Sequence, residues 1–260
     1  MTILNIGPID GPVLLFGGPY SNLHALKALI AEAERRNIPP QNAICTGDVV
    51  AYCGNPAETT ALIRDWGCHV IAGNCEEQLA AGADDCGCGF EEGSVCDALS
   101  AEWYAFSNRL IDADARAWMG ALPRFATFEA DGKRYAVVHG GAKETSRFLW
   151  PDDDKSTEIS TLRTELGPID VVISGHCGVG FVEDNWINAG VIGMPPHDGR
   201  AETEFCILDG APTLHRLSYD ASGARAAMSG RATPYGEALT TGWWPSEDVL
   251  PDRLKKLMPA

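Results

Sequence analysis

Four short motifs in this sequence each follow an apolar run of strand-forming residues and carry a side chain that can bind a metal. The four side chains are Asp48, Asn74, His139 and His176. The runs before them cover residues 43–45, 69–72, 135–137 and 171–173. Open α/β sheets place their ligand sites just beyond the carboxyl ends of the strands. One carboxylate, one amide oxygen and two imidazoles therefore predict a mixed nitrogen and oxygen pocket for a divalent transition metal.

The order of these motifs resembles that of the calcineurin-like metallophosphoesterase superfamily, in particular its small bacterial phosphodiesterase branch. The family pattern runs DxH(G/S)N, GDxV(G/A)Y, GNH(D/E), VHG and GHxH. Residues 47–52 match the second motif in full, and residues 138–140 match the fourth. The likeness extends from about residue 13 to about residue 246. It implies an α/β fold, a two-sheet α/β/β/α sandwich, and metal-dependent phosphoester hydrolysis.

The sequence departs from the family pattern at the first of the family's two metal positions. There the family holds its ion with the DxH pair, the GDx aspartate and the last histidine of GHxH. Gly18 and Tyr20 replace the DxH pair, and Gly178 replaces that histidine. The second position keeps all of its ligands, which match Asp48, Asn74, His139 and His176. The resemblance thus implies one divalent ion of Mn, Fe, Zn, Co or Ni, or two if other side chains replace the lost ligands.

Several residues near the motifs are candidates for such replacement. Cysteine thiolates bind zinc and other soft metals well, and a tyrosine can bind a metal as phenolate or donate to a substrate oxygen. The candidates for additional metal or substrate contacts are Tyr20, Asn22, Cys86, Cys88 and Cys177. The alternative is that the cysteines are small buried apolar residues and that Tyr20 only fills vacated space.

The residues for proton transfer also differ from the family. In the GNH(D/E) motif the histidine acts as general acid or orients the phosphate. Cys75 takes its place here, with Glu76 retained beside it, so these two are the predicted catalytic residues. A thiol with an ordinary pKa of about 8.5 can donate a proton but matches this task less well than imidazole. The predicted activity is hydrolysis of a small phosphomonoester or phosphodiester. The alternative is an inactive relative that binds a metal or a phosphorylated ligand for regulation or sensing.

The hydrophobic pattern predicts strands that alternate with helices, followed by antiparallel strands. The helical segments are 22–36, 57–66, a stretch that contains Trp103 and Trp118, and 156–166. Residues 125–138 predict a β-hairpin that turns at Asp131-Gly132. Residues 180–219 predict further strands, with turns at Asp198-Gly199 and Asp209-Gly210. We expect a single domain over residues 1–260, with its core at about 13–219 and a C-terminal extension at 220–260.

Composition limits the partners and the compartment. The formal net charge of −16 argues against a nucleic-acid partner, because such binding relies on Lys and Arg neutralising phosphates. The sequence lacks an apolar run long enough to span a membrane, and residues 1–11 lack the pattern of a secretory signal. The odd count of nine cysteines then predicts reduced thiols in a cytoplasm rather than a disulfide framework. A small phosphorylated molecule is the expected partner, and a homo-oligomer is left open.

Overall fold

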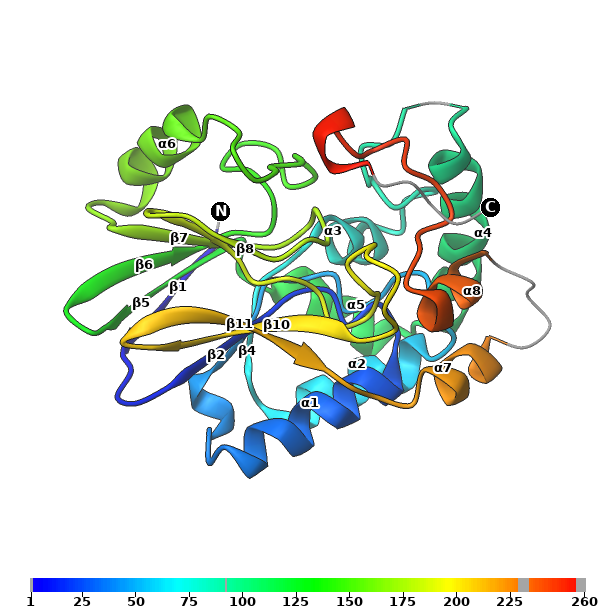
Figure 1. Cartoon of the computed structure of the whole chain (residues 1–260), viewed down its shortest axis with the longest axis horizontal. Coiled ribbons are helices and arrows are strands. Elements are labelled where there is room, and N and C mark those ends of the chain that lie inside the picture. The colour runs from blue at the N-terminus through cyan, green and yellow to red at the C-terminus, as the bar shows by residue number, and fades with distance from the viewer. Residues whose placement is uncertain (1, 92, 229–233, 256–260) are drawn as a thin grey trace.

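Two β-sheets packed face to face form the centre of the molecule, with helices on their outer faces (Figure 1). The computed structural model describes residues 2–91, 93–228 and 234–255. The first sheet has six strands in the order β1-β5-β6-β7-β9-β8, and the second has five in the order β11-β10-β2-β3-β4. This confirms the two-sheet α/β sandwich expected from the sequence. None of the helices in the described ranges is long and apolar enough to cross a membrane.

The sheets and helices have the following bounds. The six-stranded sheet consists of β1 (Ile3–Pro8), β5 (Phe125–Ala130), β6 (Lys133–Val137), β7 (Val171–Ser174), β8 (Phe181–Val182) and β9 (Trp186–Asn188). The five-stranded sheet consists of β2 (Val13–Phe16), β3 (Ala43–Cys45), β4 (His69–Val70), β10 (Thr203–Asp209) and β11 (Ala211–Leu217). The helices are α1 (Leu23–Arg35), α2 (Pro56–Trp66), α3 (Asn74–Ala81), α4 (Val95–Leu110), α5 (Ala113–Ala121), α6 (Ser156–Leu166), α7 (Ala221–Ala227) and α8 (Pro234–Thr241).

Alternation along the buried strand β2 shows how the layers are joined. Successive side chains of a strand point to opposite faces. Leu15 faces the other sheet and belongs to a buried cluster with Ile44 and Val137. Leu14 faces the helices and belongs to a cluster with Leu26 of α1. Each of these side chains is fully buried, which stabilises the fold by about 1.5–3 kcal/mol per residue.

Parallel pairing brings the motif loops of each sheet to a common edge. β2, β3 and β4 run parallel to one another in one sheet, and β6, β7 and β9 run parallel in the other. Asp48 follows β3, whereas His139 and His176 follow β6 and β7. The ligand-bearing loops therefore leave the carboxyl ends of strands from both sheets.

Some elements differ from the sequence expectations. Only His69 and Val70 of the run 69–72 form a strand, and Asn74 begins α3 instead of following a strand directly. The strand β1 was not anticipated, because its side chains are exposed or half-buried and lack a core pattern. Asp198-Gly199 lies in the loop between β9 and β10, where Trp243 packs against Gly199. The turn at Asp209-Gly210 is confirmed, since it joins β10 to β11.

Candidate metal centre

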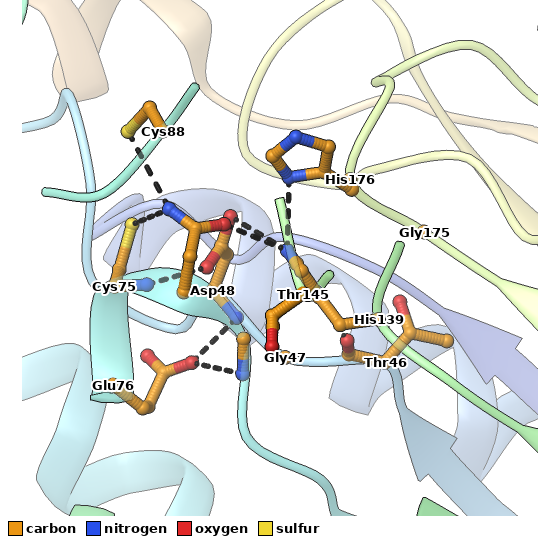
Figure 2. A network of polar contacts seen from close by, with 12 residues as sticks. Thr46, Gly47, Asp48, Cys75, Glu76, Cys88, His139, Thr145, Gly175 and His176 are labelled. Atoms are coloured by element: carbon orange, nitrogen blue, oxygen red, sulfur yellow. Dashed lines mark hydrogen bonds and ion pairs between the residues drawn. The ribbon is translucent and has the colours of Figure 1, made fainter. Parts of the chain in front are cut away.

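The loops after β3, β6 and β7 meet the start of α3 at one point. Asp48, His139 and His176 are buried and offer ligand atoms within 4.8 Å of one another. His139 stands between the other two, with its Nε2 atom 3.2 Å from Oδ2 of Asp48 and 3.1 Å from Nδ1 of His176 (Figure 2). Oδ1 of Asn74 lies 3.1 Å from the same nitrogen. The structure thus brings together all four side chains that the sequence predicts as metal ligands.

Hydrogen bonds on the outer side of these residues determine which atoms face the centre. Nδ1 of His139 lies 2.6 Å from the carbonyl oxygen of Thr46, so we assign the proton of a neutral ring to Nδ1 and a lone pair to Nε2. Nδ2 of Asn74 donates to the carbonyl oxygen of Cys86 at 2.9 Å, which turns Oδ1 inward. Two imidazole nitrogens, an amide oxygen and a carboxylate oxygen then face one another, and a single proton cannot satisfy all of them. This set of donor atoms fits a divalent transition metal. The hydrogen bond from the His139 ring to Thr46 orients the ring, as is usual for a histidine that binds a metal.

The protonation of the cluster follows from burial and from the charges within it. Burial opposes ionisation of Asp48, but the adjacent His139 outweighs it and lowers the pKa of Asp48. Burial also opposes protonation of His139, but Asp48 and the hydrogen bonds of the ring raise the pKa of His139 above its ordinary value. Burial, followed by the charge of His139, lowers the pKa of His176 to about 3. Among the candidate ligands, His139 is therefore the one at which a proton would compete with a metal.

We expect metal affinity to fall as the pH is lowered through the raised pKa of His139. The ion needs the unprotonated ring, so its binding displaces the proton that Asp48 stabilises. Because this pKa lies above the ordinary 6.5, the loss of affinity begins above that pH. Below the pKa it approaches about tenfold per pH unit, which corresponds to one proton displaced per ion. Calorimetric titration of the metal-free protein at several pH values measures this slope, and a flat profile across the neutral range would rule out His139 as the competing group.

The backbone at the cluster adopts conformations that side chains rarely allow. Asp48 has a φ of 56° and His176 a φ of 62°. Non-glycine residues occupy this left-handed region at a cost of about 1 kcal/mol or more, and such residues concentrate at functional sites. Gly73 lies directly against Asp48, and a Cβ atom at this position would overlap Oδ1 of the carboxylate. The close approach of these two loops therefore requires glycine at position 73.

Glu76 supports the Asp48 loop from the side opposite the cluster. Its carboxylate accepts the backbone N–H groups of Asp48 at 2.7 Å, Val49 at 2.9 Å, Val50 at 3.4 Å and Gly73 at 3.0 Å. Figure 2 shows the Glu76 carboxylate pointing toward the backbone at Asp48. The side chain is fully buried. Burial, followed by the charge of Asp48, raises the pKa of Glu76 to about 7. These contacts give Glu76 a positioning role, where the sequence predicted a catalytic one.

Cys75 lies beside the cluster as a buried thiol. Its backbone N–H donates to Oδ1 of Asp48 at 3.2 Å, and its sulfur lies 3.6 Å from Nδ2 of Asn74. Burial, followed by the charge of Asp48, raises the pKa of Cys75 well above its ordinary value. Cys75 therefore keeps its proton at neutral pH and is a weaker acid than a free thiol, which counts against the predicted role of proton donor.

Aromatic rings lie against the two glycines that replace ligands of the family's first metal position. A Cβ atom on Gly18 would lie 2.5 Å from the ring of Tyr20, and one on Gly178 would lie 3.2 Å from the ring of Trp244. The Tyr20 ring is buried and packs edge-on against Tyr52, with 4.8 Å between the ring centroids. Burial raises the pKa of Tyr20 well above its ordinary value. Without a bound cation Tyr20 is therefore a neutral phenol, and its ring fills the space beside Gly18.

The positions of the Tyr20 and Trp244 rings predict which substitutions would restore a second metal ion. We expect the quadruple variant Gly18→Asp, Tyr20→His, Gly178→His, Trp244→Ala to bind two ions per chain, because it returns the ligands lost from the family pattern and removes the ring that lies against Gly178. Gly18→Asp alone should bind no additional ion, since the Tyr20 ring blocks the new carboxylate. Metal analysis of both variants, with circular dichroism to confirm folding, measures the difference. A second ion in the single variant would show that Tyr20 is not the obstacle.

Asn22 and Cys177 are held by the scaffold. Oδ1 of Asn22 caps α1 by accepting the N–H of Ala25 at 3.0 Å, and its Nδ2 donates to the carbonyl oxygen of Gly193 at 3.1 Å. The sulfur of Cys177 accepts from Nδ2 of Asn188 at 3.2 Å. Burial raises the pKa of Cys177 to about 12. These contacts explain both residues structurally, although Cys177 also lines the cavity beside the cluster.

Cys86 and Cys88 form a disulfide, so the expectation of reduced thiols was wrong for this pair. The turn at Gly87, with a φ of 60°, brings their Cα atoms to 5.3 Å, a separation typical of bonded cysteines. The other seven cysteines are free. Once bonded, the pair offers no thiolate to replace a lost ligand. It contacts Asn74 instead, whose Nδ2 donates to the carbonyl oxygen of Cys86 and lies 3.5 Å from the sulfur of Cys88.

A cavity of about 70 Å³ lies beside the cluster, and both Asp48 and His176 line it. Much of its remaining wall comes from aromatic and aliphatic side chains, among them Tyr52, Phe90, Phe148, Tyr235, Trp244 and Val249. Tyr235, Trp244 and Val249 belong to residues 220–260, for which the sequence predicted only a C-terminal extension. The adjacent tryptophans at 243 and 244 were the only sign in the sequence that this segment packs against the site. The cavity residues that Trp244 joins, such as Phe148, lie far away in the sequence.

Comparisons with known proteins agree with this geometry. The family model for the calcineurin-like phosphoesterase superfamily domain matches residues 18–211. An uncharacterized protein of Methanocaldococcus jannaschii is 26% identical over 251 residues, which cover 86% of this chain and 95% of that protein. A metallophosphoesterase from Sphaerobacter thermophilus has the same fold, with a TM-score of 0.68 at 20% identity, over 90% of this chain and 100% of that one. A hypothetical protein from Pyrococcus horikoshii also has this fold, with a TM-score of 0.70 at 16% identity, over 90% of this chain and 99% of that one.

The matched segment begins at the altered first motif and extends past both histidine motifs, so it contains all four residues of the cluster. It also covers most of the chain. The protein belongs to the calcineurin-like phosphoesterase superfamily.

Proposed function

We propose that the protein hydrolyses a small phosphoester with one divalent ion held by Asp48, Asn74, His139 and His176. The observation that carries this proposal is the meeting of three electron-pair donors around Nε2 of His139, which is itself the fourth. Membership in the superfamily supports phosphoester chemistry. The aromatic filling of the first metal position favours one ion over two.

Each residue around the site has a distinct task in this proposal. A bound divalent ion supplies Lewis acidity toward a phosphoryl oxygen. Asp48 and His176 line the cavity, so a phosphate held there lies beside the cluster. Tyr20 lines the same cavity and, as a neutral phenol, can donate to a substrate oxygen. Cys75 is outside the described lining of this cavity, where its backbone N–H donates to Asp48, and Glu76 keeps the Asp48 loop in place.

Metal content and turnover, measured on the same samples, test the proposal. The metal-free protein would be loaded in turn with Mn²⁺, Fe²⁺, Co²⁺, Zn²⁺ and Ni²⁺ and assayed with an aryl phosphate ester. We expect metal-dependent turnover that is lost in His176→Ala and kept in His24→Ala. His24 is a suitable control because it lies on α1, where it pairs with Asp220 at 3.6 Å. Bound metal without turnover for all five ions would instead support a metal-binding relative with a regulatory role.

A further inference from the structure

The aromatic wall of the cavity is continuous with the metal cluster. The ring centroid of Phe148 lies 4.4 Å from that of His176 and 6.3 Å from that of Phe90. Phe90, Phe148 and Trp244 are half-buried, so part of each ring is open to a ligand. A group in the cavity would therefore touch aromatic rings while its neighbouring atoms reach the cluster.

The charge around the cavity restricts what can enter it. Among the described residues that line it there is no Lys or Arg, and Asp48 is the only carboxylate. Glu76 lies outside this lining, and its carboxylate already accepts hydrogen bonds from four backbone N–H groups. A divalent ion beside one carboxylate leaves a single positive charge at the cluster. Because unpaired charge is costly in a buried site, a monoanion suits the cavity better than a dianion.

The size of the cavity is consistent with a small planar group. One water needs about 10–15 Å³ by the same measure, and the cavity offers about 70 Å³. Planar rings pack against aromatic side chains in offset or edge-on arrangements that add to the gain from burial. A phosphate attached to the ring through one ester oxygen would lie within reach of Asp48 and His176, which line the same cavity.

We propose that the substrate is a monoanionic phosphodiester with a planar aromatic ester group, which packs against Phe148, Phe90 and Trp244. The proposal rests on the proposed function, because it uses the same site and deepens the substrate class. The aromatic wall selects the ring, and the lack of cationic side chains selects one negative charge. Phosphomonoester dianions and dialkyl phosphodiesters should bind less well.

Binding of three phosphate esters to the metal-loaded protein tests this proposal without reliance on turnover. The probes are diphenyl phosphate, diethyl phosphate and phenyl phosphate, measured by calorimetry at pH 8 with Zn²⁺ or Mn²⁺ bound. We expect diphenyl phosphate to bind at least about tenfold more tightly than either of the others. Equal affinity for diphenyl and diethyl phosphate would overturn the aromatic preference. Tighter binding of phenyl phosphate would overturn the charge selection, and failure of all three to bind would overturn both.

Variants of the aromatic wall assign the preference to the cavity. Phe148→Leu should weaken diphenyl phosphate binding by about tenfold and leave diethyl phosphate within about twofold. Trp243→Leu is the matched control, because Trp243 packs on Gly199 and is outside the described lining of the cavity. Should Phe148→Leu lose metal through its contact with His176, Phe90→Leu provides the second variant. Unchanged diphenyl phosphate affinity in a metal-loaded wall variant would overturn the assignment.

The outcomes also separate this proposal from the proposed function. If diphenyl phosphate binds most tightly but no ester is turned over, the proposed hydrolytic function is wrong and the aromatic preference of the cavity is supported. If diesters are turned over but the aryl and alkyl probes bind equally, the aromatic preference of the cavity is wrong and the proposed hydrolytic function is supported.

Discussion

His139→Ala is expected to abolish stoichiometric metal binding. The substitution removes the nitrogen at which Asp48, Asn74 and His176 meet, within 3.2 Å in each case. Loss of a residue that merely supports a ligand costs about 10–100-fold in metal affinity, so loss of this ligand should cost more than about 100-fold. Asp48→Ala should have the same effect. Inductively coupled plasma mass spectrometry of the purified variants, together with calorimetric titration, measures both quantities.

Two histidines outside the cluster provide matched controls. His24 is partly exposed on α1, and the Nε2 atom of His69 lies 3.1 Å from the carbonyl oxygen of Gln41. His24→Ala and His69→Ala should retain one ion per chain. Added metal should also raise the melting temperature of the wild type and of both controls, but not of His139→Ala, because only the folded site binds the ion. Equal metal content in wild type and His139→Ala would refute the ligand assignment.

Glu76→Ala is expected to lower the free energy of unfolding by about 3–5 kcal/mol. The substitution leaves four backbone N–H groups around Asp48 and Gly73 without their shared acceptor. These groups are buried, so water cannot replace the carboxylate without a rearrangement of the loop. Because that loop carries Asp48, metal affinity should fall together with stability. Urea unfolding of the metal-free protein isolates the effect on stability from the effect on metal binding.

The neighbouring residue Glu77 offers a control with the same chemistry. Its carboxylate is partly exposed and lies 3.9 Å from Arg124, a pair of the kind that contributes about 1 kcal/mol or less. Glu77→Ala should therefore change the free energy of unfolding by less than about 1 kcal/mol. If Glu76→Ala and Glu77→Ala proved equally stable, the anchoring role of Glu76 would be wrong.

The ligand cluster could be predicted from sequence because each member stands in a short motif beside an apolar run. Parallel pairing brings His139 and His176 to one edge of the six-stranded sheet, and Asp48 meets them from the five-stranded sheet because the two sheets pack face to face. Asn74 converges with them even though it begins a helix, because Gly73 allows its loop to approach Asp48. Local pattern and sheet topology together were sufficient for this part of the site.

The surroundings of the cluster depend on contacts that sequence pattern does not reveal. Glu76 resembles a catalytic carboxylate in its motif, but its orientation toward the backbone of residues 48–50 became visible only in the fold. The place of the Tyr20 ring above Gly18 depends on the path of the loop, in which Tyr20 has a φ of 51°. Trp244 reaches the cavity from a distant segment. These features follow from tertiary packing rather than from local periodicity.

The number of ions per chain tests the central claim most directly. The protein would be purified without chelator and without a nickel column, and native mass spectrometry would be recorded before and after addition of each candidate ion. We predict one tightly bound divalent ion per chain, held by the cluster around His139, and no second ion at similar affinity. Two ions bound with equal affinity, or none after every ion has been offered, would contradict the claim.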